Sequence, residues 1–340
     1  MQRTVIIWIV IIFVGVSAWS QEQWTPERIK NRILRQVGVE TFVDTTRVHD
    51  PVIIKENDRY YIFATGWGVS IYSSDDMNRW RSEMPVFMEP PQWAFDTVPG
   101  YNGHTWAPDI TYYNNQYILY YSISTFGKNR SAIGVATNVT LNPESKNYKW
   151  VDHGPIIIST PGKTNWNAID PNFVLDDSGH PYLSFGSFWG GLVLVRLHDD
   201  GLSVEDDVDD YKIIATRQLR NNAVEAPFIF KKEGWYYLFA SYDFCCRGAE
   251  STYKVVVGRS RDVDGEYIDA DGKSMLDGGG TLVVQGNDKY AGVGHNAVAT
   301  FEGVDYLLFH AYDMERKGAS FLRILPITWA DGWPKVAQDF

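Results

Sequence analysis

The chain has 340 residues, of which 44% are hydrophobic and 15% aromatic, and a formal net charge of −11. Nucleic acids and anionic membrane surfaces select basic proteins, so this acidic balance argues against either as a partner. The length is compatible with one closed all-β domain. The only two cysteines, Cys245 and Cys246, are chain neighbours and cannot cross-link distant segments. The fold therefore has to rest on its hydrophobic core.

Residues 1–20 have the pattern of a secretory signal peptide. Arg3 precedes an apolar run of twelve residues from Val5 to Val16, and Ala18-Trp19-Ser20 is a small-x-small cleavage pattern. The run is shorter than the roughly 20 residues that a membrane-spanning helix needs. We therefore predict a secreted or periplasmic protein with no stable membrane insertion after cleavage. An uncleaved anchor is the alternative.

Residues 21–44 are predicted to form an N-terminal segment with one short helix. Thr25 is a suitable N-cap, and Pro26 suits the first helical position. Apolar residues then recur at helical spacing, namely Ile29, Ile33, Leu34 and Val37.

Residues 45–340 contain five similar segments that begin at His49, Trp106, Ile169, Glu225 and His295. Each has a short apolar strand, a turn rich in Asn, Asp, Gly or Glu, and an aromatic second strand, which is a β-hairpin signature. Their alignment points lie 57, 63, 56 and 70 residues apart, at Pro51, Pro108, Pro171, Pro227 and Ala297. Each interval has room for four strands, so we predict an all-β, five-bladed β-propeller that forms a single domain. A two-sheet sandwich is the competing fold, but it does not explain five similar hairpins.

The first strand of a propeller blade lies nearest the central axis, so the starts of the five repeats are expected to converge. Three carboxylates lie there, those of Asp50, Asp170 and Glu225. Taken singly, an Asp before Pro is usually a turn former, and a Glu beside Ala-Pro is usually a solvated loop residue. Their shared register favours a common site instead.

Three carboxylates at one cavity suit the cleavage of a glycosidic bond. One acid must be protonated to donate to the leaving oxygen, and another must be ionised to activate water or to attack. A third can raise the pKa of the donor by charge repulsion. The residues alone assign no role to each acid and do not separate inversion from retention. His295 is open to three interpretations: a core residue, a catalytic base or a metal ligand.

Short motifs in this order resemble glycoside hydrolase family 43, and within it the endo-α-1,5-L-arabinanases. They include VHDP at 48–51, HTWAPDI at 104–110, WNAIDPN at 166–172, SFGSFWGG at 184–191, VEAPFI at 224–229 and VGHNAV at 293–298. The resemblance covers nearly all of residues 45–335, but not the segment 21–44. The pieces CCRG at 245–248 and LDGGGTLV at 276–283 point to the arabinanases rather than to the xylosidases of the family.

The resemblance implies a five-bladed catalytic propeller and an inverting mechanism. Asp50 would be the general base, Glu225 the general acid, and Asp170 the residue that tunes and holds the acid. The substrate would be internal bonds of linear arabinan, a side chain of pectin, cleaved by an extracellular monomer. Substrate contacts are implied for His49, Trp106, Phe126, Asn167, Ala168, Ile169, Ser187, Phe188 and Trp189.

His295 resembles a central histidine that the family associates with calcium. Calcium prefers oxygen ligands, so water would have to supply most of them, and the ion would support the electrostatics of the site. Two other functions are kept open. One is an exo-acting α-L-arabinofuranosidase or β-xylosidase on the same fold. The other is a non-catalytic sugar-binding propeller, which predicts that one of the three acids is missing, whereas all three are present.

Overall fold

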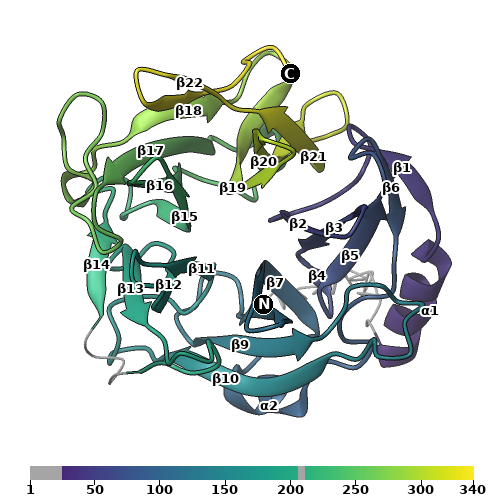
Figure 1. The fold of residues 1–340 in the computed structure, drawn as a ribbon. Helices are drawn as coiled ribbons and strands as arrows, with labels where there is room; N and C mark the ends of the chain where they lie inside the picture. Colours follow the sequence, from purple (N-terminus) through teal and green to yellow (C-terminus); the bar gives the residue numbers. More distant parts are fainter. Residues whose placement is uncertain (1–24, 206–210) are drawn as a thin grey trace, which may run out of the picture.

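The computed structural model describes residues 25–205 and 211–340 of the chain (Figure 1). The predicted signal peptide, residues 1–20, lies outside the described residues. Within the described ranges, no helix combines the length and apolar character that crossing a membrane requires.

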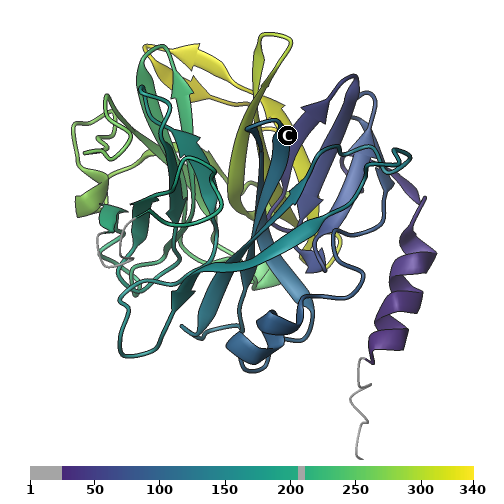
Figure 2. The same cartoon turned by 60° about the horizontal axis from the view of Figure 1, so that its bottom comes forward.

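The N-terminal segment forms a helix and a strand on the outside of the ring (Figure 2). Helix α1 spans Pro26–Gln36, and the hydroxyl of its N-cap Thr25 accepts a hydrogen bond from the Arg28 amide. Strand β1 (Glu40–Phe42) then pairs with β6 (Arg79–Ser82). The segment therefore adds an outer strand to the first blade.

Five antiparallel sheets surround a central axis (Figure 1), which confirms the predicted five-bladed β-propeller. The first blade also contains β2 (Val52–Glu56), β3 (Arg59–Ala64) and β5 (Ser70–Ser74). The second contains β4 (Gly66–Trp67), β7 (His104–Tyr113), β8 (Gln116–Ile123), β9 (Ser131–Asn138) and β10 (Val151–Ser159). The third contains β11 (Asn172–Leu175), β12 (Pro181–Phe185), β13 (Leu192–Arg196) and β14 (Lys212–Ala215).

The fourth blade contains β15 (Val224–Lys232), β16 (Trp235–Tyr242), β17 (Lys254–Ser260) and β18 (Thr281–Gln285). The fifth contains β19 (Tyr290–Phe301), β20 (Val304–Asp313) and β21 (Ala319–Pro326), and a hairpin of β22 (Thr328–Ala330) and β23 (Trp333–Lys335) follows it. Helix α2 (Gln92–Thr97) and two short 3₁₀ turns, η2 (Gly248–Glu250) and η3 (Met275–Asp277), lie in the connections.

The ring closes by side-chain packing between the last blade and the first. Ala297, Leu308 and Leu322 of the fifth blade belong to the same buried cluster as Tyr61 and Phe63 of the first. The Leu322 amide also donates a hydrogen bond to the Thr46 carbonyl oxygen across this seam, at 2.9 Å. Burial of apolar surface therefore holds the two ends of the propeller together.

The strand register corrects the alignment of the fifth repeat by one residue. Ala297 pairs with Leu308 as Val52 pairs with Phe63, so Asn296, not Ala297, is equivalent to Pro51. The mismatch arises because the fifth repeat has no proline, so that Ala297 was aligned with the prolines of the other four repeats, although Asn296 holds their position. His295 is consequently the structural equivalent of Asp50.

Candidate active site

One residue in or just before each innermost strand has a left-handed backbone, and together these residues form what we call the collar. Its members are Asp50, Ala107, Asp170, Ala226 and His295, with φ between 40° and 60°. Register shifts accompany the collar in β7, β15 and β19. Such a backbone costs about 1–3 kcal/mol for a residue other than glycine, so its recurrence in all five blades marks a functional constraint.

Four of the collar amides donate hydrogen bonds to side chains on, or directly after, the second strand of the preceding blade. The pairs are Asp50 to His310 Nδ1 at 3.1 Å, Ala107 to Thr65 Oγ1 at 2.8 Å, Asp170 to Ser122 Oγ at 3.0 Å, and His295 to Ser241 Oγ at 2.8 Å. In the third blade the equivalent position is Gly186, which has no side chain. The Ala226 amide donates to Asp170 Oδ2 instead, at 3.1 Å. This hydrogen bond holds the Asp170 carboxylate next to Ala226, the residue that follows Glu225.

The Asp50 carboxylate is buried among histidines. Its Oδ1 lies 2.7 Å from His49 Nδ1 and 3.1 Å from His295 Nδ1, and its Oδ2 accepts a hydrogen bond from Thr65 Oγ1 at 2.5 Å. Burial works to raise the pKa of Asp50, but the surrounding imidazoles, first His295 and then His49, hold it well below its usual range. Asp50 is therefore ionised, as a general base must be.

Glu225 and Asp170 form the opposite half of the site. Ser187 Oγ donates to Glu225 Oε2 at 2.6 Å, and Tyr253 also hydrogen bonds to Glu225. Burial raises the pKa of Glu225, and the bonds from Ser187 and Tyr253 oppose that rise. Burial, followed by the charges of Glu225 and Asp50, raises the pKa of Asp170 well above its usual range. The pair therefore retains a proton that Asp50 has lost.

Comparison with known proteins shows the family to which the chain belongs. The model of glycosyl hydrolases family 43 matches residues 42–334. The chain belongs to glycoside hydrolase family 43. An extracellular exo-α-(1→5)-L-arabinofuranosidase of Cellvibrio japonicus (strain Ueda107) is 46% identical over 301 residues, which cover 86% of this chain and 86% of that protein. An extracellular endo-α-(1→5)-L-arabinanase of Bacillus subtilis (strain 168) is 41% identical over 291 residues, covering 84% and 87%.

A solved arabinanase structure agrees with these relatives. An exo-1,5-α-L-arabinanase from a bovine ruminal metagenomic library has a TM-score of 0.84 and 48% identity, covering 88% of this chain and 99% of that one. The chain is therefore a glycoside hydrolase from the arabinanase and arabinofuranosidase group of family 43.

The predicted contacts of this family 43 site lie at different depths. Ser187, Phe188 and Trp189 follow β12, and a bridge between Ser187 and Glu225 ties this loop to the acid. Trp189 is 38% exposed, and the Phe188 ring lies 6.0 Å from the Phe244 ring. This loop therefore offers aromatic surface beside Glu225 for a sugar ring.

Two other predicted aromatic contacts lie on the second blade. Trp106 precedes collar residue Ala107, and its indole N–H donates to His104 Nδ1 at 3.0 Å. Phe126 follows β8 and is 74% exposed. In the described part of the chain, no ring contact or hydrogen bond joins Phe126 to the three acids.

The segment from Asn167 to Ile169 is buried beneath the site. The Asn167 side-chain oxygen accepts hydrogen bonds from Ser131 and Ser159, and the Ala168 amide donates to the Ser159 hydroxyl. These bonds fix the chain just before Asp170.

Four side chains around the acids were not predicted from the sequence: Thr65, Tyr253, His310 and Tyr312. Thr65 and His310 occupy the same position of the second strand as Ser122, Gly186 and Ser241. The repeats could have revealed them, because polar residues recur there. Tyr312 follows His310 by two residues, on the same face of β20. Tyr253 lies in the connection before β17 and has no equivalent in the repeat.

The histidines at Asp50 do not make an oxygen-rich calcium cage. Within the described ranges, the group with metal-ligand spacing is His49, Asp50 and His310, which offers two nitrogens and one carboxylate. His295 Nδ1 itself lies 3.1 Å from Asp50 Oδ1. Calcium binds six to eight oxygens, so these donors fit it poorly. No chemical step is therefore assigned to a metal.

Proposed function

We propose that this enzyme hydrolyses α-1,5-L-arabinofuranosidic bonds of arabinan, the polymer of pectin side chains, with inversion of the anomeric centre. The observation that carries the proposal is the division of charge within one cavity. Asp50 is ionised among imidazoles, whereas burial keeps a proton on the Glu225–Asp170 pair. An inverting glycosidase needs one carboxylate of each kind. The names of the relatives supply arabinan as the substrate.

In the proposed mechanism, Asp50 removes a proton from the water that attacks the anomeric carbon. Glu225 gives its proton to the oxygen of the leaving sugar, so that both bonds change in one displacement. Asp170 positions Glu225 through its bond to the Ala226 amide and, by its proximity, favours retention of the proton. Ser187 orients the Glu225 carboxyl.

The proposed substrate surface joins the predicted contacts. We assign sugar stacking to Trp106, Phe126 and Trp189, and polar or backbone contacts to the buried segment before Asp170 and to His49. Phe126 and Trp189 are exposed and Trp106 is half-buried, and aromatic rings with an accessible face suit stacking on a sugar.

We propose endo cleavage of internal bonds as the primary mode. Exo cleavage is a second candidate because two relatives of higher identity, at 46% and 48%, are described as exo-acting. Linear arabinan separates the two modes: mid-length oligomers appear early in endo cleavage, whereas exo cleavage releases only short products from a chain end.

We further propose a secreted or periplasmic monomer, since two relatives are described as extracellular.

Calcium at His295 is also kept as a proposal, with water supplying most ligands. Dialysis against EDTA followed by calcium titration tests it. Activity that falls and is restored by calcium supports the proposal, and unchanged activity removes calcium from the account.

Single replacements of the two acids test the proposed function. Asp50→Asn and Glu225→Gln should each lower kcat on linear arabinan by about 10³-fold or more, because each removes an acid–base group of the displacement. Unchanged thermal unfolding would show that the fold is intact. A rate near that of the wild type in either folded variant would contradict the assignment.

A further inference from the structure

We propose that the Cys245–Cys246 disulfide is a positioning element for Asp50, acting through Tyr312 and His49. The inference rests on the proposed function, in which Asp50 is the base. It assigns a role to two residues that neither hold the fold together nor belong to the acid pair.

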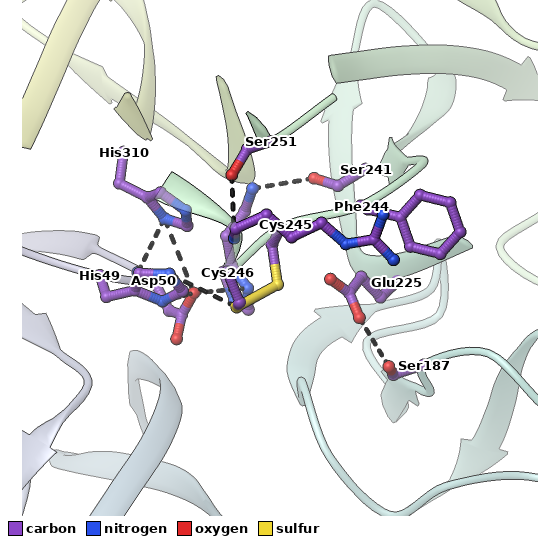
Figure 3. The surroundings of a disulfide bond; sticks show 12 residues. His49, Asp50, Ser187, Glu225, Ser241, Phe244, Cys245, Cys246, Ser251 and His310 are labelled. Carbon is purple, nitrogen blue, oxygen red and sulfur yellow. Dashed lines mark hydrogen bonds and ion pairs between the residues drawn. A yellow bond between two sulfur atoms is a disulfide. The ribbon is translucent and has the colours of Figure 1, made fainter. Parts of the chain in front are cut away.

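The disulfide lies at the mouth of the site. It joins two neighbouring residues in the connection between β16 and β17. Figure 3 shows it with His49 and Asp50 on one side and Glu225 on the other. Cys246 Sγ lies 3.9 Å from His49 Nε2 and 3.8 Å from Tyr312 Oη. The disulfide therefore packs against two side chains that lead to the base.

The backbone of Cys246 makes the decisive contact. Cys246 has a left-handed conformation, with φ of 64°, and its amide donates to Tyr312 Oη at 2.9 Å. A residue with a Cβ disfavours this conformation. The covalent link to Cys245 restricts the turn and so keeps the amide directed at Tyr312.

The Tyr312 hydroxyl connects the disulfide to the histidines. It lies 2.6 Å from His49 Nε2 and 3.2 Å from His310 Nε2. Burial raises the pKa of Tyr312, so the hydroxyl keeps its proton. A phenol has one proton to donate and two lone pairs that accept.

The hydrogen-bond partners determine where that proton points. His310 Nδ1 accepts from the Asp50 amide, so neutral His310 carries its proton on Nε2 and donates to Tyr312 Oη. The Cys246 amide occupies the second lone pair. Two acceptors then remain for the Tyr312 proton: His49 Nε2 at 2.6 Å and the Cys246 sulfur at 3.8 Å. The imidazole nitrogen is the nearer and stronger acceptor, because a sulfur accepts only weakly. In neutral His49 this selects the Nδ1–H tautomer, which donates to Asp50 Oδ1 at 2.7 Å. Burial lowers the pKa of His49, but the Asp50 carboxylate raises it above its usual value, so the tautomer applies at a pH above that raised pKa.

Without the hydrogen bond from the Cys246 amide to Tyr312 Oη, the His49 tautomer would no longer be fixed. With a lone pair free, Tyr312 can accept from His49 Nε2–H, and the unprotonated Nδ1 of His49 would then face the Asp50 carboxylate. That orientation is repulsive, and Asp50 would lose a hydrogen bond that holds it towards the attacking water. The expected defect is in turnover and not in substrate binding.

The test compares two double variants that both lack the disulfide. Cys245→Ala/Cys246→Ala should lower kcat about tenfold with KM changed less than about twofold, because the lost interaction belongs to the reacting groups. Cys245→Ala/Cys246→Gly should recover most of the loss, since glycine adopts the left-handed turn without a Cβ penalty. The thermal unfolding midpoints of both variants serve as the folding control.

Tyr312→Phe provides an independent measurement. It should lower kcat to a similar extent, and its combination with the double alanine variant should show no further loss, because both changes break the same connection. Imidazole ¹⁵N shifts should report the Nδ1–H tautomer of His49 in the wild type and a mixture in the alanine variant.

A folded double alanine variant with unchanged kcat and an unchanged His49 tautomer would overturn the proposal. Additive losses with Tyr312→Phe would also overturn it. Should the alanine variant not fold, opening the disulfide of the folded wild-type enzyme with a phosphine, which is oxidised as two thiols form, gives the same comparison. Unchanged kcat in the reduced enzyme would then overturn the proposal. These outcomes are distinct from failure of the proposed function, which would show as activity in Asp50→Asn.

Discussion

At the scale of single residues, the site depends on side chains that each satisfy two partners. The Thr65 hydroxyl accepts from the Ala107 amide and donates to Asp50 Oδ2, so it joins the collar of the second blade to the proposed base in the first. A hydrogen bond to a carboxylate contributes about 1.5–3 kcal/mol. Thr65 is therefore a positioning residue for Asp50.

Thr65→Val should lower kcat by about 10- to 100-fold, because it keeps the side-chain shape and removes the hydroxyl. Thr65→Ser should restore most of the rate. Ser241→Ala is the matched control: it removes the equivalent collar bond, to the His295 amide, without touching an acid, and should cost less. Steady-state kinetics measure all three. Equal losses in Thr65→Val and Ser241→Ala would argue against a specific role for Thr65.

The paired acids predict a pH effect. Two nearby carboxyls lose their last proton at a raised pH because the second charge forms beside the first. Asp170→Asn removes that charge, so the alkaline limb of the kcat/KM profile should move to lower pH, together with a fall in maximum rate. An alkaline limb that stays in place would show that Asp170 does not affect the proton of Glu225.

At the scale of elements, the innermost strands hold buried polar groups below the collar. Asp109 in β7 accepts hydrogen bonds from the Phe173 amide and the Asn172 side chain of the third blade. Burial raises the pKa of Asp109 to about 7 despite these bonds. The carboxyl is thus protonated in the folded protein over a pH range in which it is ionised in the unfolded chain.

Because the pKa of Asp109 is higher in the folded than in the unfolded state, its protonated carboxyl should stabilise the fold below about pH 4. This contribution should be lost as the pH rises to about 7. The loss is at most about 4 kcal/mol, since each unit of pKa difference corresponds to about 1.4 kcal/mol. Asp109→Asn should remove this pH dependence. Urea unfolding of both proteins at pH 4, 5, 6 and 7 measures it, and parallel pH curves would refute it.

The repeated hairpins were sufficient to predict the blades, because alternation and turn residues are local properties of the sequence. They also identified Asp50, Asp170 and Glu225 as residues that meet at the axis. The left-handed collar was not predictable, since Ala107 and Ala226 do not favour that conformation; contacts between blades impose it. The one-residue shift at His295 was missed because the fifth repeat has Asn296 where the other repeats have proline.

Partners that depend on inter-blade distances were also beyond the sequence. Gly186 is visible in the repeat as the one second-strand position without a polar side chain. Only the structure shows that Asp170 replaces the missing side chain at the Ala226 amide. The disulfide bond between Cys245 and Cys246 was likewise not predicted from their adjacency.

At the scale of the whole molecule, the site depends on ring closure. Asp50, the proposed base, lies in the first blade, and His310, which accepts from its amide, lies in the last. Leu322 pairs with His310 in the sheet and is fully buried at the seam between these blades. Packing at the seam therefore bears on both stability and catalysis.

Leu322→Ala should destabilise the protein by about 2–5 kcal/mol, the range for a cavity left by a buried leucine. It should also lower kcat well below the unfolding temperature, because the seam carries the contact between Asp50 and His310. Leu238→Ala, a fully buried leucine of β16 away from the seam, is the matched control and should lose stability with a smaller effect on kcat. Equal effects of the two substitutions on kcat would show that the active site does not depend on packing at the seam.

The central claim is that Asp50 activates water while Glu225 protonates the leaving sugar on the opposite side. Proton NMR of the first reducing ends released from linear α-1,5-arabinan tests it most directly, before mutarotation mixes the anomers. With inversion, the β-anomer should appear first and later equilibrate with the α-anomer. Initial release of the α-anomer would show retention and would contradict the assignment of Asp50 as the base.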